Sequence, residues 1–246
     1  MCDLWLGFGS PPLPNWGCAA NQVPLQPVCS WVGLACDSCG FATEIYLFED
    51  TLPGTISSSV GKLTSLTYLT IQSNLQLHGT LPPSIGSLLS LSVLHITNNT
   101  INGPIPLEFN QLSSLTYLEL YNNSLSGTIP DMFYNLKNIT QLYLARNVLT
   151  GNVPPSICAL TIVHQVWMFD NRFACYPTCL LNAPNPGNTL PVADPNALIP
   201  GGGGATYGSE TGNLTLLPAD QNLLDPVGSN TCAGKGLSSS FDLQSY

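Results

Sequence analysis

Leucines recur along the middle of this chain at a fixed spacing, which predicts a repeated strand and turn. Five successive copies of one 24-residue pattern, LxxLxxLxLxxNxLxGxIPxxIGx, begin at Leu63, Leu88, Leu112, Leu136 and Leu160. In each copy the Leu-x-Leu segment predicts a short strand with both leucines facing inward, because alternate residues of a strand point to opposite faces. A period of this length is typical of a solenoid, in which each coil buries its apolar face only against its neighbours.

The pattern predicts six parallel strands in one sheet. The expected strands are 45–47, 69–71, 94–96, 118–120, 142–144 and 166–168. This register requires Leu94 and Ile96 to be buried. One copy departs from the others, because the segment 74–77 carries one residue more, and this insertion predicts a local bulge.

An asparagine follows each expected strand at the same offset, where the chain must bend away. A buried amide at that place can bond backbone groups of its own coil and of the next one, which no apolar side chain can do. We interpret these residues as a structural ladder and not as a binding site. The ladder consists of Asn74, Asn99, Asn123, Asn147 and Asn171, with Asp50 at the same place in an incomplete first copy.

The repeat resembles the plant-type leucine-rich repeat family, because its second half reads LxGxIPxxIG in phase from copy to copy. The resemblance covers residues 29–179. Residues 29–36 fit the pattern C-x-W-x-G-x-x-C of an N-terminal cap in that family, and residues 171–179 (NRFACYPTC) resemble a C-terminal cap. The resemblance implies a right-handed curved solenoid, mostly β, with one parallel sheet on the concave face and irregular or 3-10 turns on the convex face. It also implies a disulfide between Cys29 and Cys36.

Composition divides the chain into four parts. We expect an N-terminal segment with a cysteine-rich cap at 1–44, repeats at 45–168, a C-terminal cap at 169–179 and an irregular tail at 180–246. The tail is rich in Pro, Gly, Asn and Ser, a composition that by itself is typical of a linker or of disorder. Its short apolar pieces need a folded surface to pack on, so we expect the tail to hold assembled copies together.

Nine cysteines cluster at the two ends of the chain and indicate an oxidising, extracellular compartment. The odd number leaves one thiol free or bonded to another chain, and Cys2 is the first candidate because it lies at the terminus. No spacing of Cys and His suits zinc, so we expect no metal. Four cysteines should form two bridges in one of three pairings: Cys158, Cys175, Cys179 and Cys232, the last anchoring the tail.

Sequons for N-glycosylation also favour secretion. Asn98 and Asn122 occupy the same site one copy apart, and we expect both to face solvent and carry glycans. The alternative is that sequons arise by chance in a chain rich in Asn and Ser. The complete set is Asn98, Asn122, Asn138 and Asn213. Residues 1–5 lack the basic region and long apolar run of a secretory signal, so we expect that a signal was removed or lies upstream of residue 1. The sequence has no run of about 18 apolar residues that would span a membrane.

Charge narrows the choice of partners. The net charge is −9, with 5 Lys and Arg against 14 Asp and Glu, which excludes binding to nucleic acid or to an acidic membrane surface by phosphate neutralisation. Only 8% of the residues are charged. We therefore expect sugars or other subunits to cover much of the exterior.

Aromatic residues collect on the face that should be concave. The central outward column runs through Tyr46, Thr70, His95, Glu119, Tyr143 and Trp167, flanked by Phe48, Tyr68, Tyr117, Tyr121 and Phe169. Stacked strands lie about 4.8 Å apart, so these residues predict a contiguous aromatic strip. Tyr and Trp commonly carry the binding energy of interfaces, although they also simply suit strands.

His95 and Glu119 should be neighbours, but no nucleophile, metal spacing or second carboxylate pair accompanies them. We therefore expect no enzyme and no cofactor. The sequence favours a structural, self-assembling subunit of an extracellular filament, coat or matrix. The alternative is a soluble recognition module that binds a protein or a glycan on its concave face, similar to polygalacturonase inhibitors or short co-receptor ectodomains.

Overall fold

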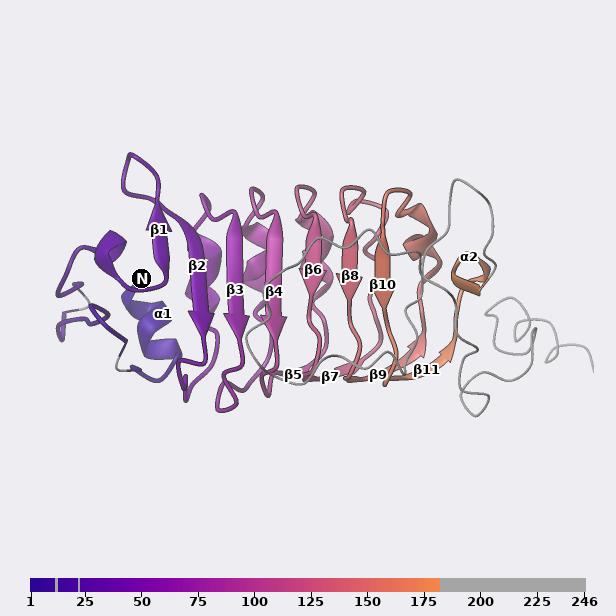
Figure 1. Cartoon of the computed structure of the whole chain (residues 1–246), viewed down its shortest axis with the longest axis horizontal. Coiled ribbons are helices and arrows are strands. Elements are labelled where there is room, and N and C mark those ends of the chain that lie inside the picture. Colours follow the sequence, from indigo (N-terminus) through magenta and orange to yellow (C-terminus); the bar gives the residue numbers. More distant parts are fainter. Residues whose placement is uncertain (12, 22, 182–246) are drawn as a thin grey trace, which may run out of the picture.

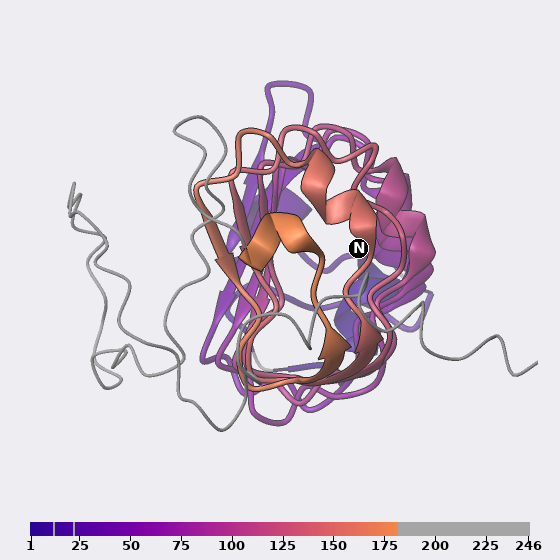
Figure 2. The ribbon, with the colours of Figure 1, turned by 90° about the vertical axis from the view of Figure 1, so that its right-hand side faces the viewer.

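The computed structural model describes residues 1–11, 13–21 and 23–181, and the predicted solenoid is confirmed. Successive coils lie side by side in sequence order, so that the chain forms one row from α1 (Cys2–Gly7) to α2 (Thr178–Leu181) (Figure 1). Viewed along that row, each coil is a closed loop with the main sheet on one side and the 3-10 helices on the other (Figure 2). The expected tail at 180–246 lies almost entirely outside the residues that the structure describes.

The main sheet has seven strands in the order β1-β2-β3-β4-β6-β8-β10. All neighbouring strands are parallel except the edge strand β1, which pairs antiparallel with β2 and was not expected. The side chains of Leu94 and Ile96 are fully buried, as the register required. The strands span Leu34–Cys36 (β1), Ala42–Phe48 (β2), Tyr68–Gln72 (β3), Val93–Thr97 (β4), Tyr117–Glu119 (β6), Gln141–Tyr143 (β8) and Gln165–Trp167 (β10).

A second sheet of four parallel strands runs below the main one in Figure 1, in the order β11-β9-β7-β5. The sequence pattern did not predict it, because its strands are short and three of the four contain glycine. Gly103 has a φ of +75°, and a Cβ built there would lie 2.8 Å from the Thr80 methyl group of the preceding coil. Glycine therefore permits both the backbone turn and the close approach of the coils. The strands are β5 (Asn102–Gly103), β7 (Ser124–Gly127), β9 (Val148–Asn152) and β11 (Arg172–Cys175).

Short 3-10 helices occupy the convex side, as expected. Close packing of η2 on η3 depends on Gly61, because a Cβ at that position would lie 2.3 Å from the Ser84 carbonyl oxygen. Tyr134 holds the equivalent place in the fourth coil, where the structure has turns instead of a 3-10 helix. The helices are η1 (Val28–Ser30), η2 (Ser58–Lys62), η3 (Pro83–Ser87), η4 (Leu107–Gln111) and η5 (Pro155–Ala159).

The asparagine ladder is confirmed by its hydrogen bonds. Asn99 donates from Nδ2 to the carbonyl oxygens of Ile71 and Thr97, both at 2.9 Å, and its Oδ1 accepts from the Asn74 backbone N–H at 2.9 Å. The other ladder asparagines repeat this arrangement. Each amide thus satisfies backbone groups where the chain leaves the sheet.

A second ladder, made of hydroxyl groups, lies at the entry of the strands and was not anticipated. Each Oγ donates to the backbone carbonyl of the equivalent residue in the preceding coil. The distances are 2.9 Å from Thr67 to Thr43, 3.1 Å from Ser92 to Thr67, and 2.9 Å from Thr116 to Ser92. The main sheet is therefore held at both ends by side chains that bond to backbone of the neighbouring coil.

The extra residue in segment 74–77 produces the predicted bulge. Leu75 is turned out of the core with 74% of its surface exposed, while Leu77 is fully buried in its place. The turn closes through a hydrogen bond of 2.9 Å from Leu77 N–H to the Asn74 carbonyl oxygen. The insertion is absorbed within one turn, so the following coils keep their register.

Disulfides close both caps, and they correct one expectation. The structure confirms the disulfide between Cys29 and Cys36, and it shows a second disulfide between Cys158 and Cys179. Cys175 is also disulfide-bonded, whereas the expected role of Cys232 lies outside the described residues. Cys2 is not free, because it pairs with Cys18; the free, exposed thiol of the described part is Cys39.

The correction for Cys2 follows from packing at the N-terminus. Helix α1 (Cys2–Gly7) lies against the first coil with Leu4 and Phe8 buried, and the Thr55 N–H donates to the Gly7 carbonyl oxygen at 2.6 Å. The N-terminal segment is therefore part of the cap, which brings Cys2 to Cys18. At the other end α2 (Thr178–Leu181) closes the last coil. None of the helices in the described residues is both long and apolar enough to span a membrane.

Candidate binding site on the concave face

The register of the main sheet aligns the expected central column. Tyr46 pairs with Thr70, Thr70 with His95, and His95 with Glu119, and the column continues through the next two strands. Glu119 pairs with Tyr143, and Tyr143 with Trp167. The residues expected on the concave face therefore do lie there, one strand apart.

Their aromatic rings form two separate groups and not the contiguous strip that the sequence suggested. Between them the column is occupied by the buried Thr70 and by a contact of 2.8 Å between His95 Nε2 and Glu119 Oε2. No ring contact joins the two groups within the described residues. We call Tyr46, Phe48 and Tyr68 the N-terminal aromatic cluster. We call Tyr121, Tyr143, Trp167 and Phe169 the C-terminal aromatic cluster.

The N-terminal aromatic cluster is open to solvent. The ring centroid of Tyr46 lies 6.5 Å from that of Phe48, with nearly parallel planes, and 6.3 Å from that of Tyr68. Phe48 is 50% exposed and Tyr68 36%. Burial raises the pKa of Tyr46 to about 12, and the negative charge and hydrogen bonding of Glu44 add to the rise.

The C-terminal aromatic cluster is packed more tightly. The rings of Tyr143 and Trp167 stack at 4.3 Å, and Tyr121 and Phe169 contact Trp167 at 6.3 and 6.2 Å. Tyr143 is only 9% exposed. Large, rigid rings held in this way offer contact area at low entropic cost, as at binding hot spots.

A cation from the chain itself already occupies part of this cluster. The Arg146 guanidinium lies 5.6 Å from the Tyr121 ring centroid, and its Nε is 3.4 Å from Asp170 Oδ2. Burial raises the pKa of the Tyr121 hydroxyl; the charge of Arg146 opposes the rise, and Asp170 adds to it. One side chain thus combines a cation–π contact with a carboxylate contact.

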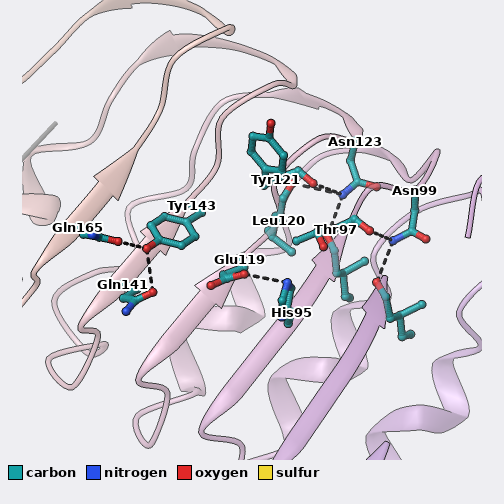
Figure 3. A network of polar contacts seen from close by, with 12 residues as sticks. His95, Thr97, Asn99, Glu119, Leu120, Tyr121, Asn123, Gln141, Tyr143 and Gln165 are labelled. Atoms are coloured by element: carbon teal, nitrogen blue, oxygen red, sulfur yellow. Dashed lines mark hydrogen bonds and ion pairs between the residues drawn. The ribbon is translucent and has the colours of Figure 1, made fainter. Parts of the chain in front are cut away.

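Amide side chains hold the tyrosines in place, as Figure 3 shows. The Tyr143 hydroxyl lies 2.8 Å from Gln141 Oε1 and also contacts Gln165 Oε1, although its one hydrogen serves one acceptor at a time. Gln141 Nε2 donates to the half-buried Tyr117 hydroxyl at 3.3 Å. Polar groups therefore fix ring positions on this part of the face before any ligand binds.

His95 and Glu119 form a further polar pair on this face, and its chemical role can be tested. Figure 3 shows the two side chains pointing toward each other across β4 and β6. The described residues contain no group of three His, Cys, Asp or Glu side chains that could hold a metal ion. The pair can exchange a proton or accept a polar ligand group, and its place is between the two clusters.

Sequence reasoning missed several residues that touch the clusters. Glu44, Gln141 and Gln165 occupy equivalent places on their strands. Glu44 pairs in register with Tyr68, and Gln141 pairs with Gln165. Strand alternation alone could have found them, because each lies two residues before a residue of the central column. Arg146 lies beyond the end of β8 with a φ of +54°, so strand alternation does not predict where its side chain points.

The expected glycosylation sites lie at the edges of the concave face. Asn98 and Asn122 both have positive φ, and Asn122 Nδ2 donates to Asn98 Oδ1 at 2.9 Å. Asparagine tolerates this left-handed conformation, so the backbone also explains why asparagine recurs at this position of the repeat. Asn138 is exposed and donates to the Ser113 carbonyl oxygen at 2.8 Å. Asn213 lies outside the described residues.

Comparison with known proteins agrees with this architecture. Residues 90–149 match the profile of the family described as Leucine rich repeat. A plant ice-binding protein is 28% identical over 70% of this chain and 54% of its own, with a TM-score of 0.61. The PEPR1–AtPEP1 structure is 28% identical over 65% of this chain and 22% of its own, with a TM-score of 0.59. This chain thus spans about half of the first and a fifth of the second.

The leucine-rich repeat ectodomain of the receptor kinase SOBIR1 from Arabidopsis thaliana is 30% identical, over 59% of this chain and 80% of its own, with a TM-score of 0.51. No curated protein is significantly similar in sequence. The profile match, the ectodomain similarity and the capped coils lead to one assignment. This chain belongs to the leucine-rich repeat family, in its plant type, with disulfide-bonded cysteines in both caps.

Proposed function

We propose that this protein is a non-enzymatic, extracellular binding module that holds a protein partner on its concave face. The observation that carries the proposal is the C-terminal aromatic cluster, whose rings are fixed by Gln141, Gln165 and Arg146. Rings already held in place lose little entropy on binding. The similarity to PEPR1, solved with AtPEP1, and to the SOBIR1 ectodomain supports a protein ligand and an extracellular location.

A pull-down with crosslinking tests the proposal. Wild-type protein is used as bait in extracellular extract, and partners and crosslink positions are identified by mass spectrometry. We expect Trp167→Ala to lose the partner, because it removes the ring that contacts the three others of the cluster. The matched control is Tyr134→Ala, an exposed tyrosine on the convex side. Equal capture by both variants, or crosslinks only on the convex side, would contradict the proposal.

Secretion and glycosylation belong to the same proposal. Asn98, Asn122 and Asn138 lie at the two ends of the strands, so glycans there would flank the concave face and leave its centre open. Intact mass before and after enzymatic removal of N-glycans tests this directly. An unchanged mass of protein from its native source would contradict the secreted interpretation.

Self-assembly is the second candidate, and the distribution of charge favours it. Residues 1–61 hold five acidic residues and no Lys or Arg, whereas residues 132–181 hold three basic residues and one acidic residue. The opposite ends of a linear solenoid therefore attract, and a head-to-tail contact that does not close builds a filament. The exposed thiol of Cys39 adds a group that could link copies. The holding role proposed for residues 180–246 lies outside the described residues and stays a prediction.

Light scattering separates the two candidates. Self-assembly predicts particles whose mass falls as salt is raised, because attraction between exposed charges is screened. Cys39→Ser should leave salt-sensitive particles but remove any that depend on a disulfide. A constant monomer mass at low salt would reject self-assembly and leave partner binding as the function.

We do not extend the activity of the ice-binding protein to this chain. Ice is periodic, so a face that binds it must repeat one spacing of similar groups. The second sheet does not: its strands range from two residues in β5 to five in β9, and the column before the turn glycines runs His78, Asn102, Ser126, Thr150. Thermal hysteresis measured on the purified protein would overturn this view.

A further inference from the structure

The two aromatic clusters differ in one respect that points to a ligand. In the C-terminal cluster a guanidinium of the chain itself, that of Arg146, lies over the Tyr121 ring and beside the Asp170 carboxylate. In the N-terminal cluster the rings and a carboxylate are present, but no lysine or arginine lies over these rings in the described part of the chain.

The carboxylate of the N-terminal cluster is that of Glu44. It lies two residues before Tyr46 on β2, so both face the concave side, and it pairs in register with Tyr68 on β3. Glu49 follows Phe48 at the end of the same strand and is exposed. The first basic residue of the chain, Lys62, is on η2, where its ammonium lies 3.8 Å from Asp3. The surroundings of the cluster are therefore acidic and aromatic.

Ring spacing suits a cation. The ring centroids of Phe48 and Tyr68 lie 6.5 and 6.3 Å from that of Tyr46. A cation placed over the Tyr46 ring would lie within about 6 Å of its centroid, the range at which aromatic faces attract cations. A guanidinium combines that attraction with a forked hydrogen bond to a carboxylate, which is the combination that Arg146 already makes at the other end.

We propose that the N-terminal aromatic cluster and Glu44 form a site for an arginine side chain of a protein partner. The inference deepens the proposed function, since it names the chemistry that the concave face recognises at this end. The site faces solvent, because Phe48 and Tyr68 are exposed. Opposite charge would also speed the encounter with a basic segment of the partner.

The test uses the full chain and two small peptides, acetyl-Gly-Arg-Gly-amide and its neutral counterpart in which citrulline replaces arginine. NMR of the aromatic side chains follows each titration. We expect saturable shifts at Tyr46, Phe48 and Tyr68 with the arginine peptide and at least fivefold weaker binding of the citrulline peptide. Equal binding of both peptides, or shifts confined to the C-terminal aromatic cluster, would overturn the proposal.

Variants locate the site. Glu44→Gln keeps the shape and removes the charge, and we expect it to weaken arginine binding about fivefold. Tyr46→Leu should weaken it further, whereas Tyr46→Phe keeps the ring and should retain most of it. Glu108→Gln, on the convex helix η4, is the matched loss of an exposed carboxylate and should change nothing. Unchanged binding in Glu44→Gln, with its spectrum otherwise native, would also reject the site.

A titration with tetramethylammonium chloride tests a different cation at the same site. Tighter binding of this ion than of the arginine peptide would reject an arginine side chain as the occupant in favour of a small quaternary ammonium ligand. The peptide titration and the pull-down test the two proposals separately. If the arginine peptide binds but Trp167→Ala captures its partner as before, the proposed function fails and the arginine site stands. If the partner is lost but no arginine binds, the inference alone fails.

Discussion

The two ends of the concave face carry the same kinds of residue and use them differently. At the C-terminal end the rings stack on one another, amides hold the hydroxyl of Tyr143, and Arg146 supplies a cation. At the N-terminal end the ring pairs are 6.5 and 6.3 Å apart, Phe48 and Tyr68 are exposed, and the neighbouring charged group is the acid Glu44. The first is a rigid platform for contact area, and the second is an open site that is short of positive charge. A repeat that is uniform inside can therefore differ strongly along its outer face.

The core beneath the clusters should not share this difference. Leu69 and Leu142 are both fully buried at equivalent places under the two ends. We expect Leu69→Ala and Leu142→Ala each to lower the free energy of unfolding by about 2–5 kcal/mol, measured in urea, because each leaves a cavity. Leu75→Ala, on the exposed bulge, is the control and should change it by less than about 0.5 kcal/mol. A large gap between the two core variants would show that the coils are not equivalent inside.

Removing one ring from each cluster should separate them. Trp167→Ala deletes three ring contacts, and we expect a loss of stability of about 1.5–4.5 kcal/mol, since each aromatic pair adds about 0.5–1.5 kcal/mol beyond burial. Tyr68→Ala deletes one contact at an exposed site, and its effect should stay below about 1 kcal/mol. Urea unfolding followed by circular dichroism gives both values. Equal losses would remove the contrast between a packed and an open cluster.

Arg146→Met should make the C-terminal cluster more like the N-terminal one. It removes the cation from Tyr121 and leaves Asp170 free, and we expect the arginine peptide to shift the Tyr121 resonance in this variant but not in the wild type. The pKa of Tyr121 should rise further, because the charge that opposes its rise is gone. If the variant acquires no arginine binding, a ring beside a carboxylate is not sufficient for the site.

The smallest expected effect concerns the ionisation of Tyr46. Its folded-state pKa of about 12 lies above the ordinary value of 10.0, so the neutral phenol is favoured, and the resulting stability is present below pH 10 and lost as pH rises toward 12. Glu44→Gln should lower this pKa, as it removes a neighbouring negative charge. Tyrosine ring NMR shifts against pH measure both proteins. No change on substitution would mean that burial alone sets the pKa.

Much of the fold follows from local rules that the sequence states directly. A 24-residue period with Leu-x-Leu fixes which residues enter the core, and the asparagine after each strand has an obligatory role because buried backbone groups need partners. The bulge at Leu75 is predictable for the same reason, since one extra residue in a fixed coil has to leave it. These features depend on neighbours along the chain or on an identical neighbouring coil.

For the concave face, the sequence predicted only which residues lie on it. Strand alternation placed Tyr46, His95, Glu119 and Trp167 on it, but only the folded coils decided which rings touch. Contact across coils depends on side-chain conformations and on polar groups such as Gln165, whose position relative to Tyr143 is set in three dimensions. The sequence therefore suggested one strip where the structure has two clusters.

By itself, then, the sequence determined the solenoid, the parallel strands of its main sheet and its asparagine ladder, and its resemblance to a known family implied the bridge of Cys29 to Cys36. Tertiary structure alone decided the pairing of Cys2 with Cys18 and the reach of Arg146 to Tyr121. The physical reason is range. A periodic pattern encodes contacts between equivalent residues, whereas a cap folded back on the first coil, or a long side chain extending to the preceding one, joins residues that no period relates.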